Sequence, residues 1–197
     1  MSRNFVSSAW KLGCLALVVL LGTGCTTLPG GMRVGMGAGA APTAVVAPAR
    51  LNASEREFVI KAANQGFYEV EVSRLAAERA VGAGVRSYAT MMVTHHTQSN
   101  NDLIDLMSAK GVAPPKGLAA DKKTKLLRLA GLPPSAEFDH GYVRVVGIED
   151  HRTNIAVLER ARRETRDRDL LAWIDRTLPT LRNHLAAAQR LSATLAG

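Results

Sequence analysis

The 197-residue sequence predicts an all-α domain. Apolar residues recur at alternating steps of three and four in four long segments, which is the spacing of helices that pack around a shared core. No segment shows the sustained alternation of apolar and polar residues that is typical of a half-buried β-strand. The first 50 residues differ in composition and lie outside the helical pattern, so the folded part is expected to occupy residues 53–197.

The first two predicted helices span residues 54–80 and about 85–110. The first begins with Ser54-Glu55-Arg56-Glu57, which matches a capping box with Ser54 as N-cap and Glu57 reaching back to it. The second stops at Gly111, a residue type favoured just after a helix end. Its apolar stripe consists of Val85, Ala89, Met92, His96, Ser99, Leu103 and Leu106.

The third predicted helix starts near Ser135, an N-cap candidate, and the fourth starts at Leu170 after the charged turn Thr165–Asp169. Both helices carry long apolar stripes, so each is expected to pack against the bundle core. The stripe of the third helix consists of Phe138, Tyr142, Val145, Ile148, His151, Ile155 and Leu158.

The lengths of the connections favour one topology. Short turns join the first helix to the second and the third to the fourth, so each pair is expected to form an antiparallel hairpin. The middle connection, Gly111–Pro134, is about two dozen residues long and contains room for a short helix at Lys122–Leu129. Two hairpins joined by a long crossover are typical of ferritin-like bundles. The sequence therefore predicts a ferritin-like four-helix bundle.

Residues 1–24 have the features of a secretory signal peptide. Arg3 and Lys11 precede the apolar stretch Leu12–Leu21, which is too short to span a bilayer and is followed by small residues. The segment before Cys25 resembles a bacterial lipobox, which implies cleavage before Cys25 and its lipidation. The absence of aspartate after Cys25 then favours an outer-membrane lipoprotein that faces the periplasm. Cleavage by the ordinary signal peptidase would instead give a soluble periplasmic protein.

Residues 25–52 are expected to form a flexible tether. They are rich in Gly, Ala and Pro and cannot bury enough apolar surface to offset the chain entropy lost on folding. Cys14 would be removed with the leader, which leaves Cys25 without a partner for an internal disulfide. Lipid attachment at Cys25 is therefore the predicted link to the membrane.

The formal net charge of +8 does not indicate a nucleic-acid partner. Half of the surplus comes from four bases in the first 50 residues, which contain no acid, so residues 51–197 carry a net charge of only +4. No nucleic-acid-binding motif is present, and only nine aromatic residues are available for base stacking. A dedicated nucleic-acid-binding protein is therefore disfavoured, and the sequence indicates no particular protein partner.

Four polar residues on the predicted inner faces carry the functional signal. Glu69, His96, His151 and His184 each lie near the middle of a different helix, within about one turn of the same height at ~1.5 Å per residue. Helical bundles build metal sites from side chains on facing helices, and neutral imidazole is the commonest metal ligand. The four residues therefore predict a metal or redox site that would hold copper or iron.

A structural hydrogen-bond network is the competing interpretation of the same residues, with Glu69, Glu71, Glu149 and Asp150 as partners of the histidines. A di-iron oxidase is disfavoured, because such sites need Glu-x-x-His on two helices. Here Val93, Ile148 and Leu181 stand three residues before the three histidines.

A copper site on the second helix is a further alternative. In Met91-Met92-Val93-Thr94-His95-His96 the pairs Met91–His95 and Met92–His96 are each four residues apart and share a face. Thioether and imidazole together favour copper, especially Cu(I). Met92 and His95 are therefore the candidate ligands of a copper site, unless Met92 simply packs in the core.

The chain resembles the bacterial family catalogued as domain of unknown function 4142. The resemblance covers about residues 55–192 and implies a ferritin-like bundle in a secreted or envelope protein, with no established activity. The family usually has aspartate where this chain has His95, and the resulting Met-x-x-His-His resembles a second envelope family with suspected copper ligands. Matching residues are Phe58, Ala62, Ala63, Gly66, Glu69, Val70, Met92, Val93, His96, Asn100, Phe138, Asp139, Tyr142, Asp150, His151, Leu178, Pro179, Leu181 and His184.

Two functions remain at the level of the sequence. The first is a non-catalytic envelope lipoprotein, such as a stress or interaction module, whose central histidines form a structural network. The second is a metal-binding or redox protein that uses the central histidine and glutamate side chains.

Overall fold

The computed structural model describes residues 50–196, and every regular element in this range is helical. The prediction of an all-α domain is therefore confirmed for these residues. Within them, no helix combines the length and hydropathy needed to cross a bilayer. The elements are α1 (Ala53–Arg79), α2 (Ala83–Ala109), α3 (Ala120–Ala130), α4 (Ala136–Tyr142), the π-helix η1 (Val143–Asp150), α5 (His151–Glu164) and α6 (Arg168–Leu195).

The predicted leader (1–24), the lipidation residue Cys25 and most of the predicted tether lie outside the described residues. Leu51 and Asn52, which the sequence assigns to the tether, belong to the folded part. The side chain of Leu51 is buried among core residues, and Asn52 caps α1.

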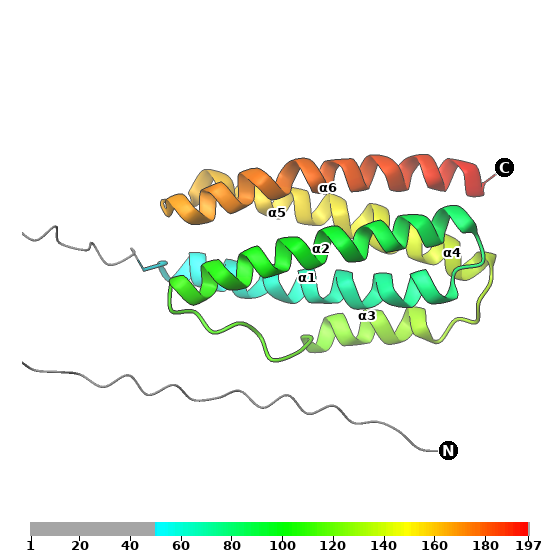
Figure 1. The fold of residues 1–197 in the computed structure, drawn as a ribbon, viewed down its shortest axis with the longest axis horizontal. Helices are drawn as coiled ribbons and strands as arrows, with labels where there is room; N and C mark the ends of the chain where they lie inside the picture. Colours follow the sequence, from blue (N-terminus) through cyan, green and yellow to red (C-terminus); the bar gives the residue numbers. More distant parts are fainter. Residues whose placement is uncertain (1–49, 197) are drawn as a thin grey trace, which may run out of the picture. The chain divides into compact units, whose positions relative to one another are not determined.

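The long helices lie side by side (Figure 1). Helix α1 packs along α2, while α4, η1 and α5 follow one another, and η1 and α5 pack against α6. Helix α6 also packs against α2 and so connects the two pairs. The short helix α3, which the sequence places at Lys122–Leu129, lies in the long connection and packs along α1 (Figure 1).

The core consists of two apolar clusters, one toward each end of the helices. Tyr68, Met92 and Phe138 are fully buried in the first cluster, and Leu103 and Leu170 in the second. Along α2, η1–α5 and α6, the residues between the two clusters include buried polar side chains rather than apolar ones. The fold therefore holds a polar layer between two apolar halves.

Two predicted helix starts are wrong by two residues. The capping box of α1 is formed by Asn52 and Glu55, not by Ser54 and Glu57: the Asn52 side chain accepts from the Glu55 amide, and Glu55 accepts from the Asn52 amide. The spacing of a capping box occurs twice in the sequence, at Asn52–Glu55 and at Ser54–Glu57. The earlier pair forms the cap because Glu55 also accepts hydrogen bonds from residues before α6. Helix α6 starts after Asp167, whose side chain caps it, rather than at Leu170.

The third predicted helix contains a π-helical segment that the sequence pattern does not reveal. Ser135 is the N-cap, as expected, but residues 143–150 form η1. In a π-helix the hydrogen bonds join residues that are five apart, so each turn contains more residues than a turn of α-helix. A different set of residues therefore faces the core. Val146 and Gly147 are therefore buried, whereas Val145 and Ile148 of the predicted stripe are only partly buried.

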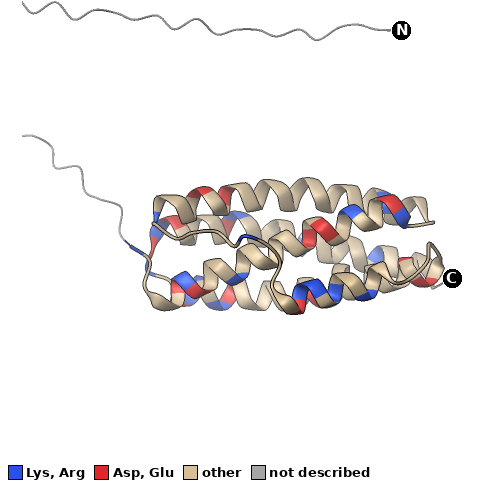
Figure 2. Ribbon diagram, turned by 90° about the horizontal axis from the view of Figure 1, so that it is seen from below, with Lys and Arg blue, Asp and Glu red and all other residues tan. Residues whose placement is uncertain are grey.

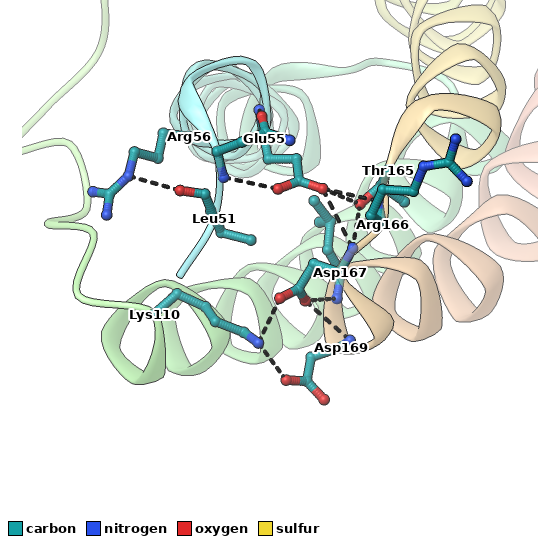
Figure 3. A network of polar contacts seen from close by, with 10 residues as sticks. Leu51, Glu55, Arg56, Lys110, Thr165, Arg166, Asp167 and Asp169 are labelled. Carbon is teal, nitrogen blue, oxygen red and sulfur yellow. Dashed lines mark hydrogen bonds and ion pairs between the residues drawn. The ribbon is translucent and has the colours of Figure 1, made fainter. Parts of the chain in front are cut away.

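A polar network ties three helices together at one end of the domain (Figure 3). Lys110, at the end of α2, contacts Asp167 and Asp169 at the start of α6, each at 2.6 Å. Glu55 of α1 accepts hydrogen bonds from Thr165 and from the Arg166 amide in the turn before α6. We call these residues the end network. Every charged group at its centre has a partner.

Residues of both charge signs are interspersed along the helices (Figure 2). Exposed ion pairs such as Lys61–Glu57 and Arg162–Asp175 join neighbouring turns or neighbouring helices. Pairs of this kind contribute about 0–1 kcal/mol each, so the stability of the fold rests on its buried contacts.

Candidate functional site

Three of the predicted histidines meet in the polar layer. His96 comes from α2, His151 begins α5 and His184 comes from α6. One ring nitrogen from each lies within 4.8 Å of the other two, and all three residues are buried. The distances between ring centroids are 5.2–5.6 Å. We call these three residues the histidine cluster.

The hydrogen bonds of the cluster fix the protonation of His151. Its Nδ1 lies 2.9 Å from the carbonyl oxygen of Val146, which can only accept, so Nδ1 carries the proton. The lone pair of neutral His151 is therefore on Nε2, which lies 3.3 Å from Nδ1 of His184. The unprotonated Nε2 of His151 therefore accepts from Nδ1 of His184 inside the cluster.

His95 supports the cluster from outside. Its Nδ1 lies 2.8 Å from Nε2 of His184, and the two rings are nearly parallel. His95 is itself exposed, so it links a buried imidazole to the surface. The structure therefore gives His95 a role as a partner of His184.

Burial keeps the cluster neutral. Loss of hydration lowers the pKa of His96 well below its usual value, and the neighbouring imidazoles lower it further. Burial, together with His151 and His95, lowers the pKa of His184 to about 3. Burial also lowers the pKa of His151, although its bond to Val146 opposes the shift. Neutral imidazoles are the form that binds metals.

Glu69 lies outside the histidine cluster but belongs to the same polar layer. Its side chain is fully buried, and its Oε1 accepts hydrogen bonds from Gln65 at 2.7 Å and from Asn154 at 3.3 Å. Its Oε2 has no partner among residues 50–196. Burial, with the charge of Asp150, raises the pKa of Glu69 to about 8, so the carboxyl is mainly protonated at pH 7.

Carboxylates do not satisfy the histidines. Within the part of the chain that the structure describes, no carboxylate is hydrogen-bonded to His96, His151 or His184. The four acids that the sequence offers for that purpose bond elsewhere, and Nε2 of His96 is buried without any partner. The acids and their partners are Glu69 with Gln65, Glu71 with Arg74, Glu149 with Arg144, and Asp150 with Lys125.

The two candidate ligands of the alternative copper site, Met92 and His95, lie in different environments. Met92 is fully buried in the apolar cluster that also contains Tyr88 and Phe138, and Met91 packs at the edge of that cluster. His95 lies on the exposed side of α2 and bonds to His184. A copper site at Met92 and His95 stays a prediction, and the packing favours a core role for Met92.

The π-helix and a glycine position His151. Because η1 ends at Asp150, its i-to-i+5 turns set the direction in which the next residue, His151, enters the bundle. Gly147 allows η1 to approach α6: a Cβ atom there would lie 2.7 Å from the Cβ of Ala188. His151 and His184 therefore meet where two backbones come unusually close.

Two cavities flank the cluster, and His96 lines both. The larger cavity, about 440 Å³, is lined by residues of α1, α2, α3, α5 and α6, including Glu69. The smaller cavity, about 210 Å³, is also lined by His95 and His184. The cluster therefore lies between two cavities.

The family model described as "Domain of unknown function (DUF4142)" matches residues 40–191, well over half of the chain. The chain belongs to this family. The resemblance seen in the sequence is thereby confirmed. No curated protein and no solved structure matches the chain.

Sequence reasoning missed three features of this DUF4142 domain: the π-helix, the bond between His95 and His184, and the larger cavity. Gly147 in the middle of a predicted helix is a weak signal for the first, since a glycine inside a helix often marks close packing. Neither of the other two has a signal in local sequence, because each depends on side chains from separate helices.

Proposed function

We propose that this DUF4142 domain binds one transition-metal ion through His96, His151 and His184. The observation that carries the proposal is the meeting of three neutral, buried imidazoles from three helices, with ligand nitrogens within 4.8 Å of one another. A structural network would leave its buried groups satisfied, whereas Nε2 of His96 has no partner. A metal ion would satisfy that nitrogen together with those of His151 and His184.

The spacing of the nitrogens supports a compact site. In a tetrahedral site with metal–nitrogen bonds of about 2.0–2.1 Å, ligand nitrogens lie about 3.3 Å apart. Nε2 of His151 and Nδ1 of His184 already have a separation of 3.3 Å, so only His96 needs to approach. Three imidazoles without carboxylate or thiolate suit Zn²⁺, Cu²⁺ or Fe²⁺ and leave one coordination position open.

The surrounding hydrogen bonds would hold two of the ligands in place. His151 would bind through Nε2 while Nδ1–H donates to Val146, as the geometry already requires. His184 would bind through Nδ1, so its proton would move to Nε2 and be donated to Nδ1 of His95. Such outer partners orient metal-bound histidines, and their loss weakens metal binding by about 10–100-fold.

We further propose that the domain is a ferritin-like bundle attached to the outer membrane through a lipid at Cys25. The hairpin pairs joined by the long connection that contains α3 support the first point. The basic, apolar and small-residue segments before Cys25 support the second. The protein would then hold its metal on the periplasmic side of that membrane.

Metal titration tests the proposal directly. The purified chain is stripped with a chelator and titrated with Co²⁺, whose visible absorption reports coordination by imidazole, and with Zn²⁺ by calorimetry. We expect one equivalent to bind, and His96→Ala, His151→Ala and His184→Ala each to weaken binding by more than about 100-fold. His95→Ala should weaken it by about 10–100-fold.

His140→Ala is the matched control, because His140 is exposed and lies outside the cluster. Binding that is substoichiometric, or that survives all three cluster substitutions, would refute the proposal. In that case the cluster would serve the bundle only as a structural network.

A further inference from the structure

The larger cavity has an exposed rim and a buried floor. Its rim includes Lys61 and Asp121, both exposed, with Asp121 on α3, the helix that lies along α1 (Figure 1). Its floor includes Glu69 and His96, which are at least nine-tenths buried. A volume of about 440 Å³ falls within the range of ~300–1,000 Å³ that is usual for pockets that bind small molecules.

Glu69 and His96 on the floor each have a buried polar atom without a partner within residues 50–196. Oε1 of Glu69 already accepts from Gln65 and Asn154, so the proton of the buried carboxyl belongs on Oε2. Oε2 has no acceptor within residues 50–196. Glu69 therefore has a hydroxyl donor without a partner beside the cavity, and a buried donor without a partner is costly.

Most of the remaining surface of the cavity is apolar, although the buried side chain of Asn100 also lines it. Leu158, Trp173 and Leu181 are buried and line the cavity. The indole N–H of Trp173 already donates to the carbonyl oxygen of Ser99 at 3.2 Å, so the remainder of the ring acts as apolar surface. An occupant would have to be largely apolar and to supply one acceptor to Glu69.

Charge disfavours ionic occupants. The rim lysines already have acidic neighbours: Lys61 pairs with Glu57 at 2.6 Å, and Lys122 lies 3.9 Å from Asp121. An anion would therefore find no free cation on the floor. A cation would meet two lysines at the rim and a neutral carboxyl at the floor, so neither charged class gains enough to offset its lost hydration.

We propose that this cavity binds a neutral, largely apolar molecule whose carbonyl oxygen accepts a hydrogen bond from Glu69. The class includes aromatic ketones and quinones, whose flat rings fit against the indole of Trp173. Of the three proposed metal ligands, His96 lines this cavity, and His151 and His184 do not. The hydrogen bond from Glu69 involves none of the three, so binding of the molecule does not require a bound metal.

Three probes of similar size test the proposal on the metal-free chain by calorimetry. They are 2-acetylnaphthalene, its hydrocarbon analogue 2-isopropenylnaphthalene, and the cationic 1-(2-naphthyl)ethylamine. We expect the ketone to bind about tenfold more tightly than the hydrocarbon, because only the ketone satisfies Glu69. Failure of the ketone to bind, equal affinity for ketone and hydrocarbon, or tighter binding of the amine would each overturn the proposal.

Two substitutions at Glu69 distinguish the effect of its hydrogen bond from the effect of the shape of its side chain. Glu69→Gln keeps a donor and should keep the preference for the ketone, whereas Glu69→Leu should reduce the preference to less than about twofold. Circular dichroism and thermal melting of each variant establish that it is folded. A preference for the ketone that persists in folded Glu69→Leu would also contradict the proposal.

His184→Ala distinguishes this proposal from the metal site. His184 lines only the smaller cavity, so its loss should abolish metal binding and leave the preference for the ketone unchanged. Glu69→Leu should reduce the preference for the ketone and leave metal binding unchanged. A metal site that fails its own titration would therefore leave the cavity proposal standing, and the reverse also holds.

Discussion

The end network and the polar layer both bury charged or polar groups, but they differ in how completely those groups are bonded. In the end network Lys110 is only 5% exposed and contacts two carboxylates, and Glu55 accepts from several donors. The buried side-chain atoms without partners within residues 50–196 all come from the polar layer or from residues beside it: Glu69 Oε2, His96 Nε2, Thr97 Oγ1 and Asp150 Oδ2.

The difference separates groups that hold the fold from groups that are available to a ligand. Burial alone would lower the pKa of Lys110, but its bonds to Asp167 and Asp169 raise it, so the network keeps its charges. Burial likewise opposes ionisation of Glu55, and the donors around it still lower its pKa. In the polar layer burial prevails, and His96 and Glu69 stay neutral. Unsatisfied neutral groups destabilise the empty protein and gain most from a bound ion or molecule.

Breaking the end network should have the largest effect on stability. Asp167→Ala leaves Lys110 with one carboxylate and removes the N-cap of α6. We expect the free energy of unfolding to fall by about 3–5 kcal/mol, because the buried ammonium loses most of its compensation. Urea denaturation followed by circular dichroism measures the change.

Asp175→Ala is the control for that experiment, because Asp175 forms an exposed pair with Arg162 and should cost less than about 1 kcal/mol. If both substitutions had equally small effects, the end network would not stabilise the fold more than a surface pair does.

The pH dependence of stability should reveal the polar layer. His184 has a pKa of about 3 when folded and 6.5 when unfolded, so its contribution is present above pH 6.5 and is lost as the pH falls. His96 and His151 act in the same direction. Glu69 has the opposite sign: its pKa rises from 4.5 to about 8, so its contribution is present below pH 4.5 and is lost as the pH rises through 8.

Stability of the metal-free chain should therefore be greatest near pH 6.5 and decline on both sides, by about 1.4 kcal/mol per pH unit for each titrating group. Urea denaturation at pH 4.5–8.5 tests this expectation. Glu69→Gln should flatten the alkaline limb, and His184→Ala should make the acid limb less steep. His140→Ala, at an exposed position, should change neither limb. A profile that Glu69→Gln leaves unaltered would show that Glu69 is not held neutral.

Replacing an unsatisfied group should have the smallest effect. His96→Leu removes a buried nitrogen that has no partner and keeps a side chain of similar size. We expect the free energy of unfolding of the metal-free chain to change by less than about 1 kcal/mol, since no hydrogen bond of that nitrogen is lost. Urea denaturation in the presence of a chelator gives the value. A loss as large as that of Asp167→Ala would mean that His96 is structural, and the contrast between the two regions would disappear.

Much of the fold follows from local patterns. The steps of three and four place all four long helical stretches, Gly111 ends α2 with a positive φ of 67°, and Ser135 caps α4. The capping box was harder to locate, because the two overlapping candidate pairs have the same local spacing and differ only in their contacts with distant residues. Asn52 and Glu55 prevail through contacts with Thr165 and Arg166, which lie more than a hundred residues away.

The candidate site also has features that local sequence predicts and features that it does not. Helical periodicity alone indicates that Glu69, His96, His151 and His184 face inward, and all four are buried. Periodicity does not say which of them meet. The π-helix before His151 changes the rotation of the chain, so three imidazoles gather while Glu69 bonds to Gln65 and Asn154.

By itself, the sequence determined an all-helical domain, its family and the set of buried polar residues, because helical period, caps and composition act within a few turns of chain. Only the tertiary structure decided that three histidines form a cluster without carboxylate partners and that Glu69 faces a cavity. The reason is physical: distances between side chains on different helices depend on backbone approach and rotation, as at Gly147 and η1. These quantities leave almost no trace in local sequence.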